Sequence, residues 1–85
     1  MTLRLRGDVS TVDTEYGTVL LDGADGRYWQ LNATASAAFR ALLDGSTVEQ
    51  AAQQLTAVYD VEESQARGDV ERLVARLRAA RVVEA

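Results

Sequence analysis

The stretch that decides the fold runs from Arg27 to Gly45 and reads RYWQLNATASAAFRALLDG. Its first five residues favour a β-strand, because tyrosine and tryptophan fit the pleated, half-buried surface of a sheet. Asn32 can then cap a helix over 33–43, since its side chain accepts from the open N–H groups of the first turn, and Gly45 ends that helix. The aromatic residues of this strand are either ordinary core or part of an edge kept open for a ligand.

Two further strands are expected before this stretch. Val9–Tyr16 and Thr18–Leu21 are rich in β-branched residues, and Gly17 separates them. The segment DGADG (22–26) supplies turn chemistry, because its glycines tolerate positive φ. Together with 27–31, these segments predict a meander of three antiparallel strands.

Two further helices are expected after it. Ser46 and Glu49 have the spacing of a capping box and open a helix, and Asp60 and Glu63 repeat that spacing before a helix that runs to about Ala80. Helical periodicity predicts the inward residues of the three helices: Ala35, Phe39, Leu42 and Leu43; Val48, Ala51, Ala52, Leu55 and Val58; Val70, Leu73, Val74 and Leu77. Residues 82–83 are expected to end the chain as a short extended piece. The order β-β-β-α-α-α predicts one α+β domain over residues 1–85, of the winged helix-turn-helix type.

The composition argues against catalysis. The chain has no Cys and no His, which excludes thiol nucleophiles, imidazole bases and the usual zinc sites. Glu62 and Glu63 point about 100° apart on a helix, so they are interpreted as first-turn acids rather than as a metal or catalytic pair. Asp22 and Asp25 lack the rest of an EF-hand loop and are interpreted as turn residues. We therefore expect no enzyme, no cofactor and no metal.

Charge and hydropathy limit the partners. The net charge is −4, residues 7–26 hold five acids and no base, and 64–85 hold five arginines against three acids. This balance argues against binding to nucleic acid in general, and no apolar run approaches the roughly 20 residues of a membrane span. Cytoplasmic is the default location.

Two other functions stay open from these residues. A small winged-helix DNA-binding regulator would use VEQAAQQLTAV (48–58) as its recognition helix, where glutamines can read base edges but no arginine holds phosphates. A carrier would hold a small molecule or a finished peptide in its core.

The aromatic strand and the last helix together suggest a slot for a peptide. Trp29 and Leu31 face one way and Tyr28 and Gln30 the other, and a free edge at 27–31 would be a template for an incoming strand. The last helix would supply the opposite wall, with Val70, Leu73 and Leu77 bordered by Asp69, Arg72 and Arg76. The alternatives remain a Trp29 that is pure core and arginines that form a solvated helix face.

The chain from Tyr28 to Val83 resembles the PqqD-like family. The features that carry the resemblance are a strand ending in Leu-Asn, a helix ending in Leu-Leu-Asp-Gly, a helix with Leu and Tyr-Asp, and Asp-Val in the last helix: Leu31-Asn32, Leu42 to Gly45, Leu55, Tyr59-Asp60 and Asp69-Val70. Phe39 stands where relatives often carry Trp, and residues up to Gly26 match only in strand pattern.

The resemblance implies a RiPP recognition element, similar to the standalone protein that binds the leader of a lasso-peptide precursor for a separately encoded leader peptidase and cyclase. In this family the leader adds as an antiparallel strand and drops apolar side chains against the last helix. Carried onto this sequence, the site comprises Arg27, Tyr28, Trp29, Gln30 and Leu31 on the strand, and Asp69, Val70, Leu73, Arg76 and Leu77 on the helix.

Overall fold

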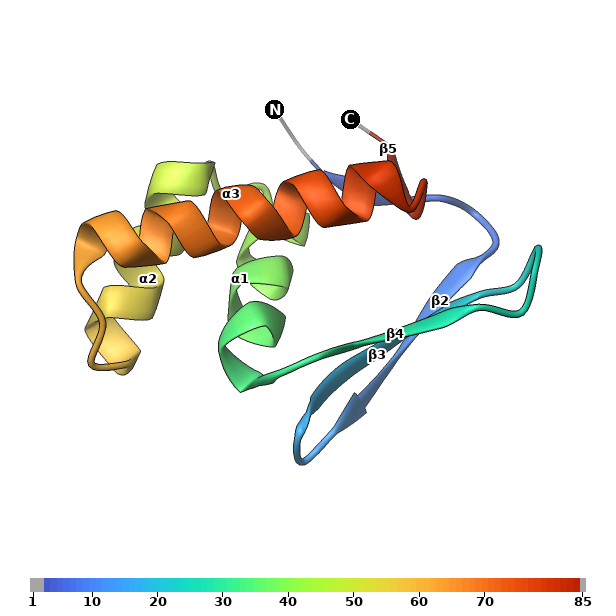
Figure 1. Ribbon diagram of the computed structural model, residues 1–85, viewed down its shortest axis with the longest axis horizontal. Coiled ribbons are helices and arrows are strands. Elements are labelled where there is room, and N and C mark those ends of the chain that lie inside the picture. Colours follow the sequence, from blue (N-terminus) through green and yellow to red (C-terminus); the bar gives the residue numbers. More distant parts are fainter. Residues whose placement is uncertain (1–2, 85) are drawn as a thin grey trace.

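The computed structural model describes residues 3–84 and places a small sheet beside three helices (Figure 1). The sheet contains β2, β3 and β4 in that order, all antiparallel, and the helices follow it in the chain. The elements are β1 (Arg4–Leu5), β2 (Val9–Thr14), β3 (Gly17–Asp22), β4 (Tyr28–Leu31), α1 (Ala33–Leu43), α2 (Val48–Val58), α3 (Glu63–Ala79) and β5 (Val83–Glu84). The predicted fold, three antiparallel strands followed by three helices, is confirmed.

Two short strands near the chain ends form a separate two-stranded sheet. β1 pairs with β5 in antiparallel register, with Arg4 opposite Glu84 and Leu5 opposite Val83. The sequence predicts the extended end at 82–83 but not its partner, because two residues carry too little periodicity to mark a strand. This pairing brings the segment before β2 against the C-terminal end of α3.

The β2–β3 hairpin is tighter than predicted. β2 ends at Thr14, which pairs with Gly17, so Tyr16 lies in the turn and not in the strand. Gly17 has φ +142°, and a Cβ there would overlap the carbonyl oxygen of Leu31. Only glycine therefore lets this hairpin lie against the end of β4, where the chain enters α1.

The start of α1 is as predicted. The Asn32 side chain accepts a hydrogen bond from the Ala35 N–H at 2.9 Å, which satisfies one open donor of the first turn. Gly45 follows the helix with φ +100°, a conformation that favours glycine. Both ends of α1 are thus set by residues that the sequence identifies.

The starts of the other two helices differ from the prediction. Thr47, and not Ser46, caps α2, and it exchanges hydrogen bonds with Gln50 in a capping box. Glu62 is the N-cap of α3 and makes no side-chain capping bond, so the predicted Asp60–Glu63 box is wrong. Several polar residues stand before each helix, and their spacing alone does not choose among them.

The core lies between the inner face of the sheet and the helices. Phe39 of α1 and Leu20 of β3 are both 0% exposed, α1 packs on β3 and β4, and α2 and α3 pack on each other and on α1. The predicted inward residues of α3 are all buried. Val58 is an error, since this last residue of α2 is 76% exposed. All three helices therefore lie on one face of the sheet.

Candidate functional site

The outer edge of β4 is not paired with another described strand. In the sheet order β2-β3-β4, this strand bonds only to β3. The Arg27 carbonyl accepts from the Asp22 N–H at 2.8 Å, and the bonds of an antiparallel ladder alternate between the two sides of a strand. The N–H and C=O groups of Tyr28 and Gln30 therefore point away from β3, toward the open edge.

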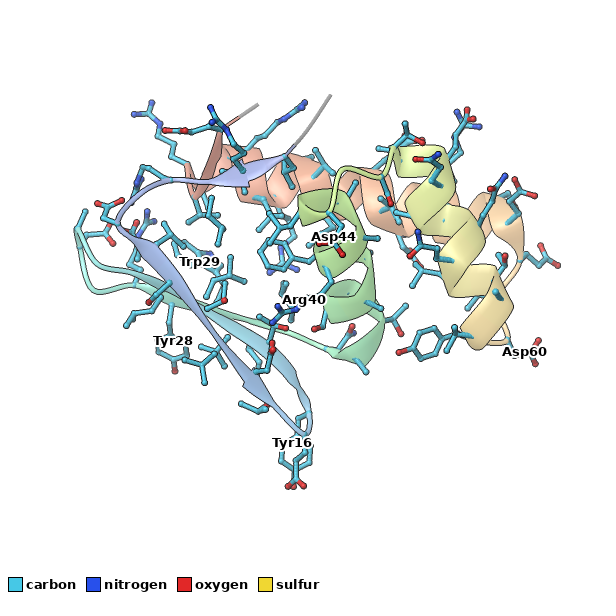
Figure 2. All side chains as sticks on the ribbon, turned by 180° about the vertical axis from the view of Figure 1, so that it is seen from behind. Tyr16, Tyr28, Trp29, Arg40, Asp44 and Asp60 are labelled. Carbon is cyan, nitrogen blue, oxygen red and sulfur yellow. The ribbon has the colours of Figure 1, made fainter. Side chains whose placement is uncertain are left out.

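The side chains of β4 alternate as predicted. Trp29 and Leu31 lie on the helix side of the sheet, whereas Tyr28 and Gln30 lie on the other side and are exposed. Figure 2 shows the Trp29 and Tyr28 side chains on opposite sides of the strand. Leu31 is buried in the core, and Trp29 is half-buried and packs against it. The guanidinium carbon of Arg27 lies 5.0 Å from the centre of the Trp29 ring, which favours a cation–π contact. Trp29 is thus neither pure core nor free surface.

A hollow of ≈ 220 Å³ opens between α1 and α3, just beyond the end of β4. Small side chains on α1 leave this space, and Val70 and Leu73 of α3 form its apolar floor. Its lining residues are Asn32, Thr34, Ala35, Ala38, Leu55, Asp69, Val70 and Leu73. The hollow has the size and chemistry to receive an apolar side chain.

A second hollow of ≈ 290 Å³ lies next to the first and reaches back along β4. It shares Asn32 and Ala35 with the first hollow, and its other lining residues are Tyr16, Gln30, Leu31 and Arg76. The two hollows form one depression, which we call the α1–α3 groove. Because Gln30 and Leu31 line it, the groove runs beside the open edge of β4.

The arginines of α3 have different surroundings. Arg67 pairs with Glu49 of α2 at 2.9 Å and with Glu71 at 3.4 Å, and Arg72 pairs with Asp69. Arg76 is exposed at the groove and takes part in none of the ion pairs between residues 3–84. It therefore offers the groove a charge that is not already neutralised by a neighbour.

The structure brings together most, but not all, of the predicted site residues. Gln30, Leu31, Asp69, Val70, Leu73 and Arg76 line the groove. Tyr28 and Trp29 lie on the adjacent strand, and Arg27 precedes that strand and bonds to Asp25 at 2.8 Å. Leu77 is 3% exposed and belongs to the core rather than to the groove lining.

Sequence reasoning missed the contribution of α1. Asn32, Thr34, Ala35 and Ala38 form one side of the groove, and Tyr16 reaches it from the β2–β3 turn. The signal was present in the alanine-rich start of α1, because small residues at helical spacing leave room where larger ones would fill the core. Tyr16 could not have been found, since only the folded hairpin places it there.

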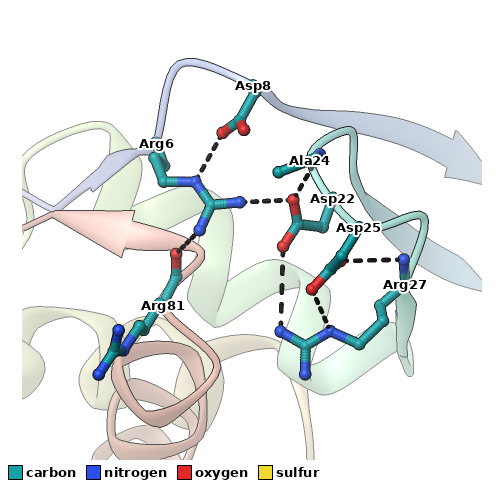
Figure 3. Close-up of polar contacts among 7 residues, drawn as sticks. All are labelled: Arg6, Asp8, Asp22, Ala24, Asp25, Arg27 and Arg81. Atoms are coloured by element: carbon teal, nitrogen blue, oxygen red, sulfur yellow. Dashed lines mark hydrogen bonds and ion pairs between the residues drawn. The ribbon is translucent and has the colours of Figure 1, made fainter.

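A polar cluster joins α3 to the sheet at the other end of β4 (Figure 3). The Arg6 guanidinium donates to the Arg81 carbonyl just after α3 at 2.6 Å, to Asp22 at the end of β3 at 2.5 Å, and to Asp8 at 2.6 Å. Asp22 is 1% exposed and also accepts from the Ala24 N–H at 2.9 Å. We call Arg6, Asp8, Asp22 and the Arg81 carbonyl the Arg6 clamp.

The contacts of the clamp favour the ionised forms of Asp22 and Arg6. The Ala24 N–H, and then the Arg6 guanidinium, lower the pKa of the Asp22 carboxyl. Hydrogen bonds to Asp8 and Asp22 raise the pKa of Arg6. Asp22 is therefore more than the turn residue that the sequence suggested. Arg6 was not predicted, because two of its partners, Asp22 and the Arg81 carbonyl, lie far away in the chain.

The described residues offer no site for a metal. Within 3–84, no group of three or more His, Cys, Asp or Glu side chains is placed to hold an ion. Asp22 and Asp25 bond to arginines, and Glu62 and Glu63 stand at the start of α3. No helix in the same residues is long and apolar enough to cross a membrane. The groove and the open edge of β4 are therefore the candidate ligand site.

The family of coenzyme PQQ synthesis protein D (PqqD) matches residues 17–83, which contain the open edge and the groove. The chain belongs to the PqqD family. Its fold is that of a PqqD-like RiPP recognition element, as the resemblance implied. No curated protein sequence matches the chain.

Solved structures with the same fold support this assignment. Lasso peptide synthetase B1, complexed with the leader peptide, is 42% identical, with a TM-score of 0.92 and full coverage of both chains. The PqqD truncation of Methylobacterium extorquens PqqCD, a stand-alone RiPP recognition element, is 32% identical, with a TM-score of 0.76 over 98% of this chain and 88% of that one. TbiB1 in complex with the TbiA(beta) leader peptide, at 22% identity, a TM-score of 0.84 and coverage of 96% and 95%, shares the fold.

Proposed function

We propose that this chain binds the leader segment of a ribosomally synthesised precursor, of the lasso-peptide class, as a single domain over residues 1–85. The observation that carries the proposal is the open edge of β4 beside the α1–α3 groove. It occurs in a chain that is 42% identical over its whole length to lasso peptide synthetase B1, which was solved with a leader peptide. An edge strand with a free ladder is a template for an extended peptide.

The leader joins the sheet as an antiparallel fourth strand. Its backbone bonds to the N–H and C=O groups of Tyr28 and Gln30, each bond contributing about 0.5–1.5 kcal/mol net. Leader residues opposite Trp29 and Leu31 then point to the helix side, where the groove receives them. A buried apolar side chain contributes about 1.5–3 kcal/mol, against about 2–5 kcal/mol for ordering the peptide. We expect a micromolar complex or tighter, which corresponds to about −8 kcal/mol or below.

The groove, rather than the backbone bonds, selects the sequence. The first hollow has Val70 and Leu73 as its floor and suits an apolar anchor. The second hollow presents Arg76 and suits an acidic or hydrogen-bonding side chain. The two hollows share a border at Asn32 and Ala35, so they are suited to leader residues close together in sequence.

The role is non-catalytic. The domain holds the leader and presents the precursor to a separately encoded leader peptidase and to a cyclase, which raises the effective concentration of the substrate at those enzymes. This takes place in the cytoplasm, where ribosomal products are made. The comparisons lend no support to a DNA-binding regulator, and the only charged residue of α2, Glu49, is an acid paired with Arg67.

The groove assignment is tested by filling the groove. Ala35 is half-buried and lines both hollows, so Ala35→Phe places a ring where the leader side chains would lie, without burying a charge. We expect the affinity for a fluorescent precursor peptide to fall by about 100-fold, a loss of about 2.7 kcal/mol.

Ala37→Phe is the matched control. Ala37 is also half-buried, but it lies on the opposite side of α1, where it lines a shallow hollow with Asp13 and Arg40. The Ala37→Phe variant should bind the precursor with the affinity of the wild type. Equal affinities of the wild type and a folded Ala35→Phe variant would refute the groove assignment, and circular dichroism checks the fold of both variants.

A further inference from the structure

The two hollows of the α1–α3 groove differ in charge. The first is lined by Asp69, which already pairs with Arg72. Among residues 3–84, no aspartate or glutamate lines the second hollow, although the whole chain has 13 acidic residues and a net charge of −4. The second hollow instead has Arg76, which forms no ion pair within the part of the chain that the structure describes. An acidic protein therefore keeps one part of its groove free of acids.

The polar side chains of the second hollow can all donate hydrogen bonds. The Asn32 carboxamide oxygen already accepts from the Ala35 N–H at 2.9 Å, so its NH₂ group is left for a ligand. Tyr16 lines the same hollow from the tip of the β2–β3 hairpin (Figure 2), and its hydroxyl bonds to no other residue of 3–84. A tyrosine hydroxyl can donate to a carboxylate, and an arginine can hold one with two parallel bonds. Donors without a competing acid fit a carboxylate ligand.

We propose that the groove recognises a short motif in the leader: an apolar residue, then any residue, then an aspartate or glutamate. The apolar side chain occupies the first hollow, and the carboxylate bonds to Arg76 and Tyr16 in the second. This inference rests on the proposed function and specifies which side chains the leader supplies. Tyr16 is then a specificity-determining residue that lies outside both β4 and α3.

The spacing of the motif follows from α3. The floor of the first hollow is centred between Val70 and Leu73. Arg76 lies about 4.5 residues further along the helix, or about 6.8 Å at about 1.5 Å per residue. Two residues of an extended strand span the same length, about 6.8 Å, and their side chains point to the same side. The apolar residue and the acid are therefore two positions apart in the leader.

The direction of the motif follows from β4. The second hollow reaches back to Gln30 in the strand, whereas the first reaches forward to Thr34 in α1. A leader that is antiparallel to β4 runs the other way, so it passes the first hollow before the second. The acid is then the leader residue opposite Leu31, which lines the second hollow, and the apolar residue precedes it.

The test measures how strongly the domain prefers an acid over its amide. The probe is the fluorescent precursor peptide, compared with copies in which single Asp or Glu residues of the leader are replaced by Asn or Gln. We expect one replacement to lower the wild-type affinity by about fivefold, at a position two residues after an apolar residue whose change to Ala also weakens binding. Moving that acid by one position should abolish the preference, because its side chain then points to the other face of the sheet.

Arg76→Gln and Tyr16→Phe remove the two donors separately. With Arg76→Gln, the acid and amide peptides should bind equally well. With Tyr16→Phe, which keeps the ring, the ratio of the two affinities should fall to about twofold. A general distortion of the groove weakens both peptides alike and leaves this ratio unchanged. The ratio therefore reports the contacts to the carboxylate and not the integrity of the groove.

Arg4→Gln and Tyr59→Phe are the matched controls, because they remove a guanidinium and a phenol hydroxyl from residues that line neither hollow. Both variants should keep the wild-type ratio. A precursor that binds the wild type but has no sensitive acid in its leader overturns the motif, as does a ratio that survives in Arg76→Gln. A ratio that survives in Tyr16→Phe overturns the role of Tyr16. Failure of the wild type to bind the precursor at all rejects the proposed function itself.

Discussion

The two ends of β4 are built in opposite ways. At its N-terminal end, the Arg6 clamp joins α3 to the sheet through charged hydrogen bonds, one of them to the 1% exposed Asp22. At its C-terminal end, small side chains of α1 leave two hollows between α1, α3 and the strand. One end fixes the position of α3, and the other leaves space beside it. A peptide slot needs both, because a groove of defined width requires a wall that does not move.

Removing the clamp is the most severe way to test this contrast. Arg6→Gln removes the guanidinium that bonds to the buried Asp22 carboxylate at 2.5 Å and leaves the Arg27 guanidinium 4.0 Å away. Losing the closer partner of a buried charge is unfavourable. We expect a melting temperature lower by several degrees. Hydrogen exchange should quicken in the last turn of α3, which Arg6 holds through the Arg81 carbonyl.

Arg4→Gln is the control for this variant. Arg4 is an exposed residue of β1, two positions away, and it forms none of the ion pairs among residues 3–84. It should melt as the wild type does. If Arg6→Gln melts at the same temperature as Arg4→Gln, the clamp does not hold α3.

Lowering the pH should destabilise the Arg6 clamp less than the Arg6→Gln substitution does. The pKa of Asp22 in the folded protein is below its ordinary value of 3.8, so the folded state favours the ionised carboxyl. Its contribution to stability is complete above pH about 3.8 and is lost as the pH falls through the lowered pKa. We expect the melting temperature of the wild type to fall more steeply between pH 5 and 2 than that of Asp22→Asn.

The measurement compares the two proteins at each pH, because other carboxylates titrate in the same range. These carboxylates change the melting temperatures of both proteins in the same way, so the difference between the two melting temperatures reports Asp22 alone. Asp22→Asn should be the less stable protein at pH 7, with the gap narrowing toward pH 2. A gap that stays constant with pH would mean that the charge of Asp22 contributes nothing to the fold.

The same contrast explains what the sequence could predict. The order of elements, the Asn32 cap and the buried stripe of α3 follow from patterns within a few residues of one another. The open edge of β4 also follows, because it is the last strand of a meander. Local pattern likewise marked the α3 residues that line the groove, whereas Leu77, which the sequence also assigned to the site, is 3% exposed and lines neither hollow.

What could not be predicted depends on residues far apart in the chain. Arg6 meets Asp22 and the Arg81 carbonyl only after folding, across separations of 16 and 75 residues. The pairing of β1 with β5 is of the same kind. The α1 side of the groove is different, because it is formed by side chains that are small. An alanine in a helix is compatible both with close packing against a neighbour and with an open groove. The two cases can be distinguished only when the position of the facing helix is known.

The smallest expected effect is at the open end, where Arg76 borders the second hollow. Arg76→Glu should weaken the binding of a leader with an acidic residue at that position by about three- to tenfold at low salt, and by less at high salt, because exposed charges are screened. Arg4→Glu lowers the net charge by the same two units, from −4 to −6, on β1, which lines neither hollow. If both variants weaken leader binding equally, the leader responds to the total charge of the domain. If the loss of affinity in Arg76→Glu is the same at low and high salt, Arg76 contributes through packing and not through its charge. A salt-dependent loss of leader affinity that occurs only in Arg76→Glu means that the groove selects the charge of the leader. The Arg6 clamp then serves only to hold α3 in position.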